Sequence, residues 1–441
     1  MKRSENRIIS SHAGSLPRPP DLLEMNRAKQ TGQPIDEAAR AARIKSAVPE
    51  VVRQQVAAGM DVINDGEYGK TNFLNYVQDR LGGFERTGRL EQMGAMADNR
   101  RDRHLFSDFY QDELANRWGG RPQLACTGPV TYVGHKLLQT DFDNFKAALQ
   151  GVNVAETYLP ALGPTYAGEN RYYKTQEEYE VAVAEAMAEE YRAIVAAGFV
   201  LQIDDPGLPA MWDAHIPAIS VEEYRKDAAR RVELVNHALR GIPEDRVRYH
   251  ICWGSWHGPH VTDLPLEDIV DLMLQVKAQC YSIEAANARH EHEWRVWQDT
   301  KLPDGKLLMP GVVSHATNVV EHPRLVADRI IRYANIVGRE NVIAGTDCGM
   351  GGRVHPQICW AKLEALSEGA ALATTELWGC HLPRPMRPFS GGLGAEPPSS
   401  IQKARPWQRR SCGSAHTHAP CAPSAGAWRQ SPHLQYTRGN P

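Results

Sequence analysis

An imidazole and a thiol stand two residues apart in this sequence, at His250 and Cys252, directly after an apolar, β-prone run. Side chains two residues apart on a strand point to the same side of the sheet, so both groups could face one point. Zinc accepts nitrogen and sulfur ligands together, but a lone His-x-Cys pair also arises by chance in ordinary cores. The pair therefore predicts a metal site only if further ligands come from elsewhere in the chain.

Two further candidate ligands lie at the ends of later β-prone runs. Glu284 ends the run at residues 280–284, and Cys348 follows the run at residues 341–346. With the first pair they form a set of two thiolates, one imidazole and one carboxylate, which suits tetrahedral zinc. Such an electron-rich site is a weak Lewis acid for hydrolysis, but it can bind a further thiol as a nucleophilic thiolate. The set therefore predicts alkylation of a thiol.

The elements that must position these ligands repeat one theme, a short β-prone run followed by a polar loop and a helical stretch. The predicted strands are residues 7–11, 61–65, 123–127, 199–204, 246–252, 280–284, 307–314 and 341–346. The predicted helices are residues 35–58, 176–197, 221–239, 266–277, 323–337 and 357–368. Eight such units predict an α/β fold, a (β/α)8 TIM barrel with insertions, of which residues 133–174 form the largest. A doubly wound open sheet is the alternative, but no Gly-rich phosphate loop follows an early strand.

Nearly every predicted strand ends on a polar or metal-binding group, and the carboxyl ends of barrel strands meet at one mouth. The endings are His12-Ala13-Gly14-Ser15, Asp65-Gly66-Glu67, Thr127-Gly128-Pro129, Asp204-Asp205-Pro206, His250-Ile251-Cys252, Glu284, Ser314-His315 and Asp347-Cys348. Two cysteines, several histidines and several acids would therefore converge on one site. By contrast, His290 and His292 lie in a charged segment, and we interpret them as solvated surface in preference to a second metal pair.

Composition separates a body, residues 1–379, from a tail, residues 380–441. Eight of the 50 Lys and Arg and one of the 53 Asp and Glu lie in the tail, which gives it a charge near +7 and the body one near −10. The tail is rich in proline and has no amphipathic period, so we expect it to be disordered. We interpret it as an accidental extension; a metal-binding or nucleic-acid-binding tail is the alternative.

The remaining composition predicts a cytoplasmic protein with small-molecule partners. A net charge of −3 gives no reason to expect a nucleic acid or an anionic membrane as a partner. The sequence contains no run of about 18 apolar residues, the length that a membrane span needs. The charged N-terminus lacks the apolar stretch of a signal peptide. The eight cysteines are sparse and irregularly spaced, which favours free or metal-bound thiols over disulfides.

Taken in order, these motifs resemble the cobalamin-independent methionine synthase family, specifically its catalytic C-terminal barrel. The resemblance covers nearly all of residues 1–379. It rests on residues 12–19, Asp65-Gly66-Glu67, residues 127–131, Ile203-Asp204-Asp205-Pro206, His250-Ile251-Cys252, Ile283-Glu284, residues 311–315 and Asp347-Cys348-Gly349. The resemblance implies a methyltransferase of methionine biosynthesis that holds Zn2+.

The resemblance also implies a role for each site residue. Zinc is held by His250, Cys252, Glu284 and Cys348. The thiol substrate, homocysteine or a similar compound, is bound by Gly14, Ser15, Glu67 and Asp204. His315 is the proton donor to the leaving group.

The methyl donor stays open between a folate and a corrinoid. The chain lacks the N-terminal barrel with which long members of the family help to hold folate, and Tyr132-Val133-Gly134-His135 follows the motif after which they carry a pterin-stacking Trp. The short chain also resembles the epoxyalkane–coenzyme M transferases, which open epoxides with a zinc-bound thiolate. Further alternatives are a methylated aromatic donor, a metal-free barrel similar to uroporphyrinogen decarboxylase, and a non-catalytic relative.

Overall fold

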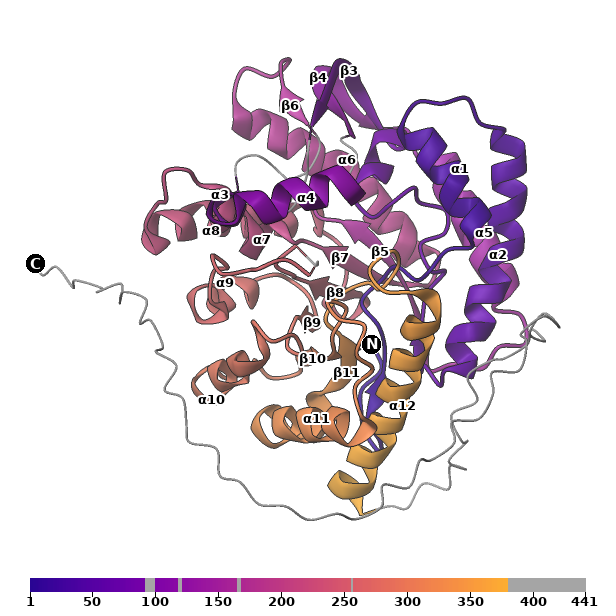
Figure 1. Cartoon of the computed structure of the whole chain (residues 1–441), viewed down its shortest axis with the longest axis vertical. Helices are drawn as coiled ribbons and strands as arrows, with labels where there is room; N and C mark the ends of the chain where they lie inside the picture. Colours follow the sequence, from indigo (N-terminus) through magenta and orange to yellow (C-terminus); the bar gives the residue numbers. More distant parts are fainter. Residues whose placement is uncertain (92–99, 118–120, 165–167, 255–256, 380–441) are drawn as a thin grey trace, which may run out of the picture. The chain divides into compact units, whose positions relative to one another are not determined.

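The computed structural model describes residues 1–91, 100–117, 121–164, 168–254 and 257–379. Eight parallel strands lie in the order β1-β11-β10-β9-β8-β7-β5-β2. Their bounds are β1 Ile9–Ser10, β2 Val62–Ile63, β5 Glu156–Leu162, β7 Val200–Asp204, β8 Val247–His250, β9 Cys280–Ile283, β10 Leu307–Val313 and β11 Ile343–Thr346. The sheet closes between its edge strands, where the Asp61 backbone amide donates to the Ser10 carbonyl at 3.2 Å. The predicted (β/α)8 barrel is confirmed (Figure 1).

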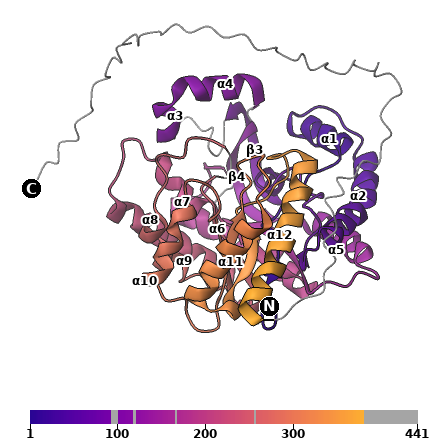
Figure 2. The ribbon, with the colours of Figure 1, turned by 60° about the horizontal axis from the view of Figure 1, so that its bottom comes forward.

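Helices surround this sheet, as Figure 2 shows. The main ones are α1 Pro20–Gln30, α2 Glu37–Ala57, α5 His135–Ala148, α6 Gln176–Ala196, α8 Val221–Ala238, α11 Pro323–Val337 and α12 Pro356–Trp378. Shorter ones are α7 Gly207–Ala210, α9 Val270–Met273 and α10 Val296–Asp299. Every residue of β7, β8, β9, β10 and β11 is buried, as expected of parallel strands covered by helices. Among the described residues, no helix is long and apolar enough to cross a membrane.

One predicted strand is wrong. Residues 123–127 lie in β4, Arg121–Tyr132, which belongs to a separate three-stranded sheet with β3, Leu81–Glu91, and β6, Glu169–Asn170. The third barrel strand is β5, which pairs with β2 and β7 inside the segment predicted as an insertion. Proline cannot donate to a ladder and argues against a central strand, and Pro160 stands in the middle of β5. The Thr127-Gly128-Pro129 motif is therefore not a barrel strand end.

Polar side chains fill the barrel beneath the mouth. The guanidinium of Arg248, on β8, donates to Gln202 Oε1 at 2.6 Å and to Ser11 Oγ at 2.9 Å. It also lies over the Tyr158 ring, 3.8 Å from its centroid. Gln202 in turn donates to Asp204 Oδ1 at 2.6 Å. These contacts form a hydrogen-bonded network beneath the side chains at the strand ends.

The tail lies outside the described residues, which all belong to one unit, Met1–Gly391. Its predicted disorder and the domain boundary at residue 379 stay predictions. The segment between β3 and β4 contains α3, Arg101–Leu105, and α4, Ser107–Arg117. It reaches the loop that follows β8, because the Asp102 carboxylate accepts the backbone amides of His260 and Val261, each at 3.1 Å.

Candidate active site

The imidazole and the two cysteines lie together at the carboxyl ends of β8 and β11. The ligand atoms of His250, Cys252 and Cys348 all lie within 4.8 Å of one another. His250 Nδ1 is 2.9 Å from Ser282 Oγ on β9. Its Nε2 is buried without a nitrogen or oxygen partner among the described residues, and the ring interacts with the Cys348 thiol. A buried ring nitrogen beside two thiols fits a soft or borderline metal ion.

The charges of this trio favour a thiolate. A hydrogen bond from the Cys252 thiol and the neighbouring His250 imidazole outweigh burial and hold the pKa of Cys348 well below its ordinary value. Burial alone would lower the pKa of His250, but its contact with Cys348 raises that pKa above the ordinary value. Thiolates, not thiols, bind metals and act as nucleophiles, so the trio is already suited to either use.

Glu284 lies beside this trio but in a second cluster. Its carboxylate and the ligand atoms of His315 and Asp347 lie within 4.8 Å of one another. Glu284 Oε1 accepts the Trp253 backbone amide at 3.0 Å, and Oε2 accepts the Asn287 side-chain amide at 2.8 Å. Burial, reinforced by the nearby Asp347 carboxylate, raises the pKa of Glu284 to about 8. The predicted role of Glu284 as the fourth ligand therefore stays a prediction.

His315 faces a cavity of about 350 Å3, which Glu284 also lines. The histidine is 2% exposed, and both ring nitrogens are buried without a hydrogen-bond partner among the described residues. Burial lowers its pKa to about 4. A neutral imidazole with two uncommitted nitrogens can donate one hydrogen bond and accept another.

The four predicted thiol-binding residues lie around the same mouth. A Cβ at Gly14, whose φ is +142°, would come within 2.8 Å of Glu67 Oε1. The Ser15 carbonyl accepts the backbone amides of Met350 and Gly351 at 2.8 and 2.9 Å, next to Cys348. Asp204 is the register partner of His250 in the β7–β8 ladder.

The two carboxylates among these residues, Asp204 and Glu67, are each in an unusual state. Burial raises the pKa of Asp204 to about 7. Glu67 adopts a left-handed backbone, with φ of +60°, and its Oε2 lies 3.3 Å from the Lys70 ammonium. A non-glycine residue held in that region at a site is typical of functional positions. The carboxylates are therefore buried, close together and held in place, while their binding role stays a prediction.

Three polar residues of the site were not predicted. Ser282 lies on β9, two residues before Glu284, which directly follows the strand, and that spacing indicates that both side chains point to the same side. Asn287 donates to Glu284 Oε2 at 2.8 Å and to Asp347 Oδ2 at 3.2 Å. No local sequence pattern distinguishes Asn287, or the buried Lys70, from an ordinary loop residue without a role in the site.

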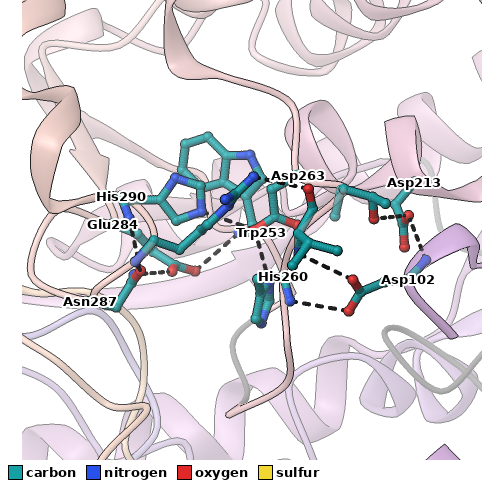
Figure 3. Close-up of polar contacts among 12 residues, drawn as sticks. Asp102, Asp213, Trp253, His260, Asp263, Glu284, Asn287 and His290 are labelled. Atoms are coloured by element: carbon teal, nitrogen blue, oxygen red, sulfur yellow. Dashed lines mark hydrogen bonds and ion pairs between the residues drawn. The ribbon is translucent and has the colours of Figure 1, made fainter. Parts of the chain in front are cut away.

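The interpretation of His290 as solvated surface is wrong, although His292 is exposed. His290 is 3% exposed and stacks on Trp253 with ring centroids 4.0 Å apart (Figure 3). Its Nδ1 lies 2.9 Å from Glu293 Oε2, and its Nε2 lies 3.0 Å from Asp263 Oδ2. Burial is offset by these two carboxylates, which raise the pKa of His290 to about 10. His290 is thus an internal ion-pair partner in the wall of the cavity.

Comparisons with known proteins show what the chain is similar to. Residues 164–371 match the model of the cobalamin-independent synthase catalytic domain. A methionine synthase from Thermococcus kodakarensis is 24% identical over 376 residues, which cover 84% of this chain and 94% of the relative. A 2-hydroxypropyl-CoM lyase from Xanthobacter autotrophicus is 25% identical over 364 residues, or 76% of this chain and 86% of that relative.

A solved structure supports the fold. The B12-independent methionine synthase from Shewanella sp. W3-18-1 superposes with a TM-score of 0.63 at 19% identity, covering 85% of this chain and 100% of that one. The B12-independent methionine synthase described as putative from Listeria monocytogenes gives a TM-score of 0.58 at 17% identity.

Proposed function

Because this chain is related to the cobalamin-independent methionine synthases through their catalytic barrel, we propose that it is a zinc-dependent methyltransferase acting on a homocysteine-like thiol in the cytoplasm. The observation that carries the proposal is the trio of His250, Cys252 and Cys348 at the barrel mouth. A barrel that decarboxylates without a metal has no need of paired thiols beside an unpartnered imidazole nitrogen.

The residues present fit zinc. His250 would bind through its unpartnered Nε2, because Nδ1 faces Ser282, and the two cysteines would bind as thiolates. Glu284 is the proposed fourth ligand, since its buried carboxylate lies near enough to Cys348 for the two charges to interact. When bound, zinc would hold the substrate sulfur as a thiolate at neutral pH and leave it nucleophilic.

The remaining side chains would orient the thiol. The carboxylates of Glu67 and Asp204 would accept hydrogen bonds from its ammonium group, and the turn at Gly14 and Ser15 would bring backbone against it. Burial of both carboxylates strengthens such a contact, because few water molecules compete for the charge. The ammonium group is thus the part of the thiol that we expect these residues to recognise.

The chemical step is a displacement at carbon. The S–CH3 bond forms as the bond between the methyl group and the donor breaks, and the donor leaves with the electron pair of that bond. His315, which burial keeps neutral, would donate a hydrogen bond to the departing atom from one of its uncommitted ring nitrogens. The two reactants would meet in the cavity next to His315, where positioning lowers the barrier.

The identity of the methyl donor is still open, and one observation bears on it. The Tyr132 hydroxyl is bonded to Glu190 inside the molecule, and His135 pairs with Glu189 on the surface. Neither residue lines the cavity, so this segment supplies no stacking platform there. A folate remains the first candidate donor; a methylated corrinoid and an epoxide are the alternatives.

Metal analysis and a substrate screen test the proposal. We expect close to one zinc per chain, most of which is lost in Cys252→Ser and in Cys348→Ser. Cys280→Ala is the matched control, because that thiol is buried on β9 outside the trio. Purified protein with intact cysteines that neither holds nor takes up zinc would contradict the proposal, as would failure to methylate any thiol with a folate or corrinoid donor.

A further inference from the structure

A buried ion pair holds the loop that carries His315. Glu321 Oε1 accepts the Ser314 backbone amide at 2.8 Å, and Oε2 lies 2.8 Å from the Lys362 ammonium. The Glu321 and Lys362 side chains are 7% and 0% exposed. Neither residue lines the cavity. The pair therefore acts on the site only through the backbone of this loop.

The ammonium group fastens the loop at a second point. Lys362 comes from α12 and also donates to the Val319 carbonyl at 2.5 Å. Residues 317–319, in the middle of the loop, are exposed, and Val319 is 69% exposed. Helices α11 and α12 lie side by side in both views, so the pair joins the loop to a rigid support (Figures 1 and 2).

The orientation of the His315 ring depends on the backbone of this loop more than is usual for a buried histidine. Buried imidazoles are usually oriented by a hydrogen bond to one ring nitrogen. Neither nitrogen of His315 has such a partner among the described residues. The direction of the ring is therefore set by its backbone and by packing, and the residue directly before it is the one that Glu321 holds.

We propose that Glu321 is a positioning residue for His315 and that Lys362 serves to neutralise its buried charge, which rests on the function proposed above for that histidine. A buried ion pair is weak evidence for stability, because hydrophobic residues of similar volume often serve as well. Here the carboxylate has a second task, since one oxygen holds the Ser314 amide while the other is neutralised. A misplacement of about 1 Å at a reacting group can cost on the order of 100-fold in rate.

Two double variants separate positioning from charge. Glu321→Met with Lys362→Met removes the hydrogen bond to Ser314 and leaves no buried charge. Glu321→Gln with Lys362→Met also removes both charges but keeps an oxygen that can accept the Ser314 amide. We expect kcat to fall about 100-fold in the first at unchanged KM and zinc content, and the second to restore most of it.

The opposite results would overturn the proposal. It fails if the Met–Met variant keeps the wild-type kcat, or if the Gln–Met variant loses as much as the Met–Met variant does. Should the Met–Met variant not fold, Glu321→Asp provides the same test, because it keeps the charge and withdraws the oxygen from Ser314 by one methylene. A wild-type kcat in Glu321→Asp would equally overturn the proposal.

A measurement without substrate distinguishes this proposal from the proposed function. The ring proton resonances of His315, assigned by their loss in His315→Gln, should shift in the Met–Met variant and return in the Gln–Met variant. Unmoved resonances would reject the positioning role even in an active enzyme. Moved resonances in a protein that transfers no methyl group would reject only the proposed function.

Discussion

Ser282 Oγ lies 2.9 Å from His250 Nδ1, across the ladder between β9 and β8. This contact occupies Nδ1 and leaves the opposite nitrogen, Nε2, without a hydrogen-bond partner among the described residues, in a ring that lies close to the two cysteines. Partners of this kind fix the tautomer and the orientation of a metal-binding histidine. A proton on Nδ1, donated to the serine oxygen, leaves the Nε2 lone pair free for a ligand bond.

Ser282→Ala should therefore weaken zinc binding by about 10- to 100-fold without unfolding the protein. Competition with a chromophoric chelator measures the change. Cys280→Ala, two residues earlier on the same strand and outside the trio, is the control and should bind zinc as the wild type does. Equal affinities in all three proteins would contradict the orienting role of Ser282.

Cys348 should react as a thiolate at neutral pH in protein freed of metal. Its pKa is held well below the ordinary value by the Cys252 hydrogen bond and by His250. A lowered pKa means that the thiolate is present at pH 7 and is lost only as the pH falls through the lowered pKa. Mass spectrometry after a brief pulse of iodoacetamide, repeated across pH, measures the midpoint of this loss.

Two comparisons make that prediction specific. Cys252→Ala should move the midpoint for Cys348 upward, because the largest cause of its lowered pKa is removed. Cys280, whose pKa is raised to about 12 by burial, should stay unlabelled throughout. Labelling of Cys348 that begins only near pH 9 would show that the trio does not favour a thiolate.

Binding of an amino-acid thiol should strengthen as the pH rises through about 7. Burial raises the pKa of Asp204 to about 7, so the carboxylate carries its charge above that pH and loses it below. Asp204→Asn should remove this pH dependence. It should also lower the affinity for the thiol by roughly 10-fold, because one charge-assisted hydrogen bond is lost. Calorimetry with homocysteine and with a thiol lacking the amino group measures both effects; equal losses for the two ligands would argue against an ammonium contact.

Part of this site could be predicted from the sequence because strand ends and motif spacing are local. His250 is the last residue of β8, and Cys252 and Cys348 each come two residues after a strand, β8 and β11, although residues 251 and 252 were predicted to lie within the strand. The third strand could not be predicted in the same way. Pro160 argues against β5 locally, and only its pairing with β2 and β7 outweighs that signal.

Burial and side-chain partnership are even less visible in the sequence. His290 sits in a charged segment, yet two carboxylates and the Trp253 ring enclose it. Asn287 contacts both Glu284 and Asp347, the latter 60 residues further along the chain. Such contacts depend on how distant loops pack together, which periodicity and spacing do not encode.

Gly14→Ala should disturb thiol binding more than folding. Gly14 has a φ of +142°, which side chains rarely adopt, and an added Cβ would lie 2.8 Å from Glu67 Oε1. The clash would push the Glu67 carboxylate away and add strain of roughly 1–3 kcal/mol. We expect KM for the thiol to rise at least about 10-fold while zinc content stays at the wild-type level. Gly352→Ala, at a φ of +75° with open space around its Cβ, controls for backbone strain alone. An equal rise in KM in both variants would show that the contact with Glu67 is not what matters.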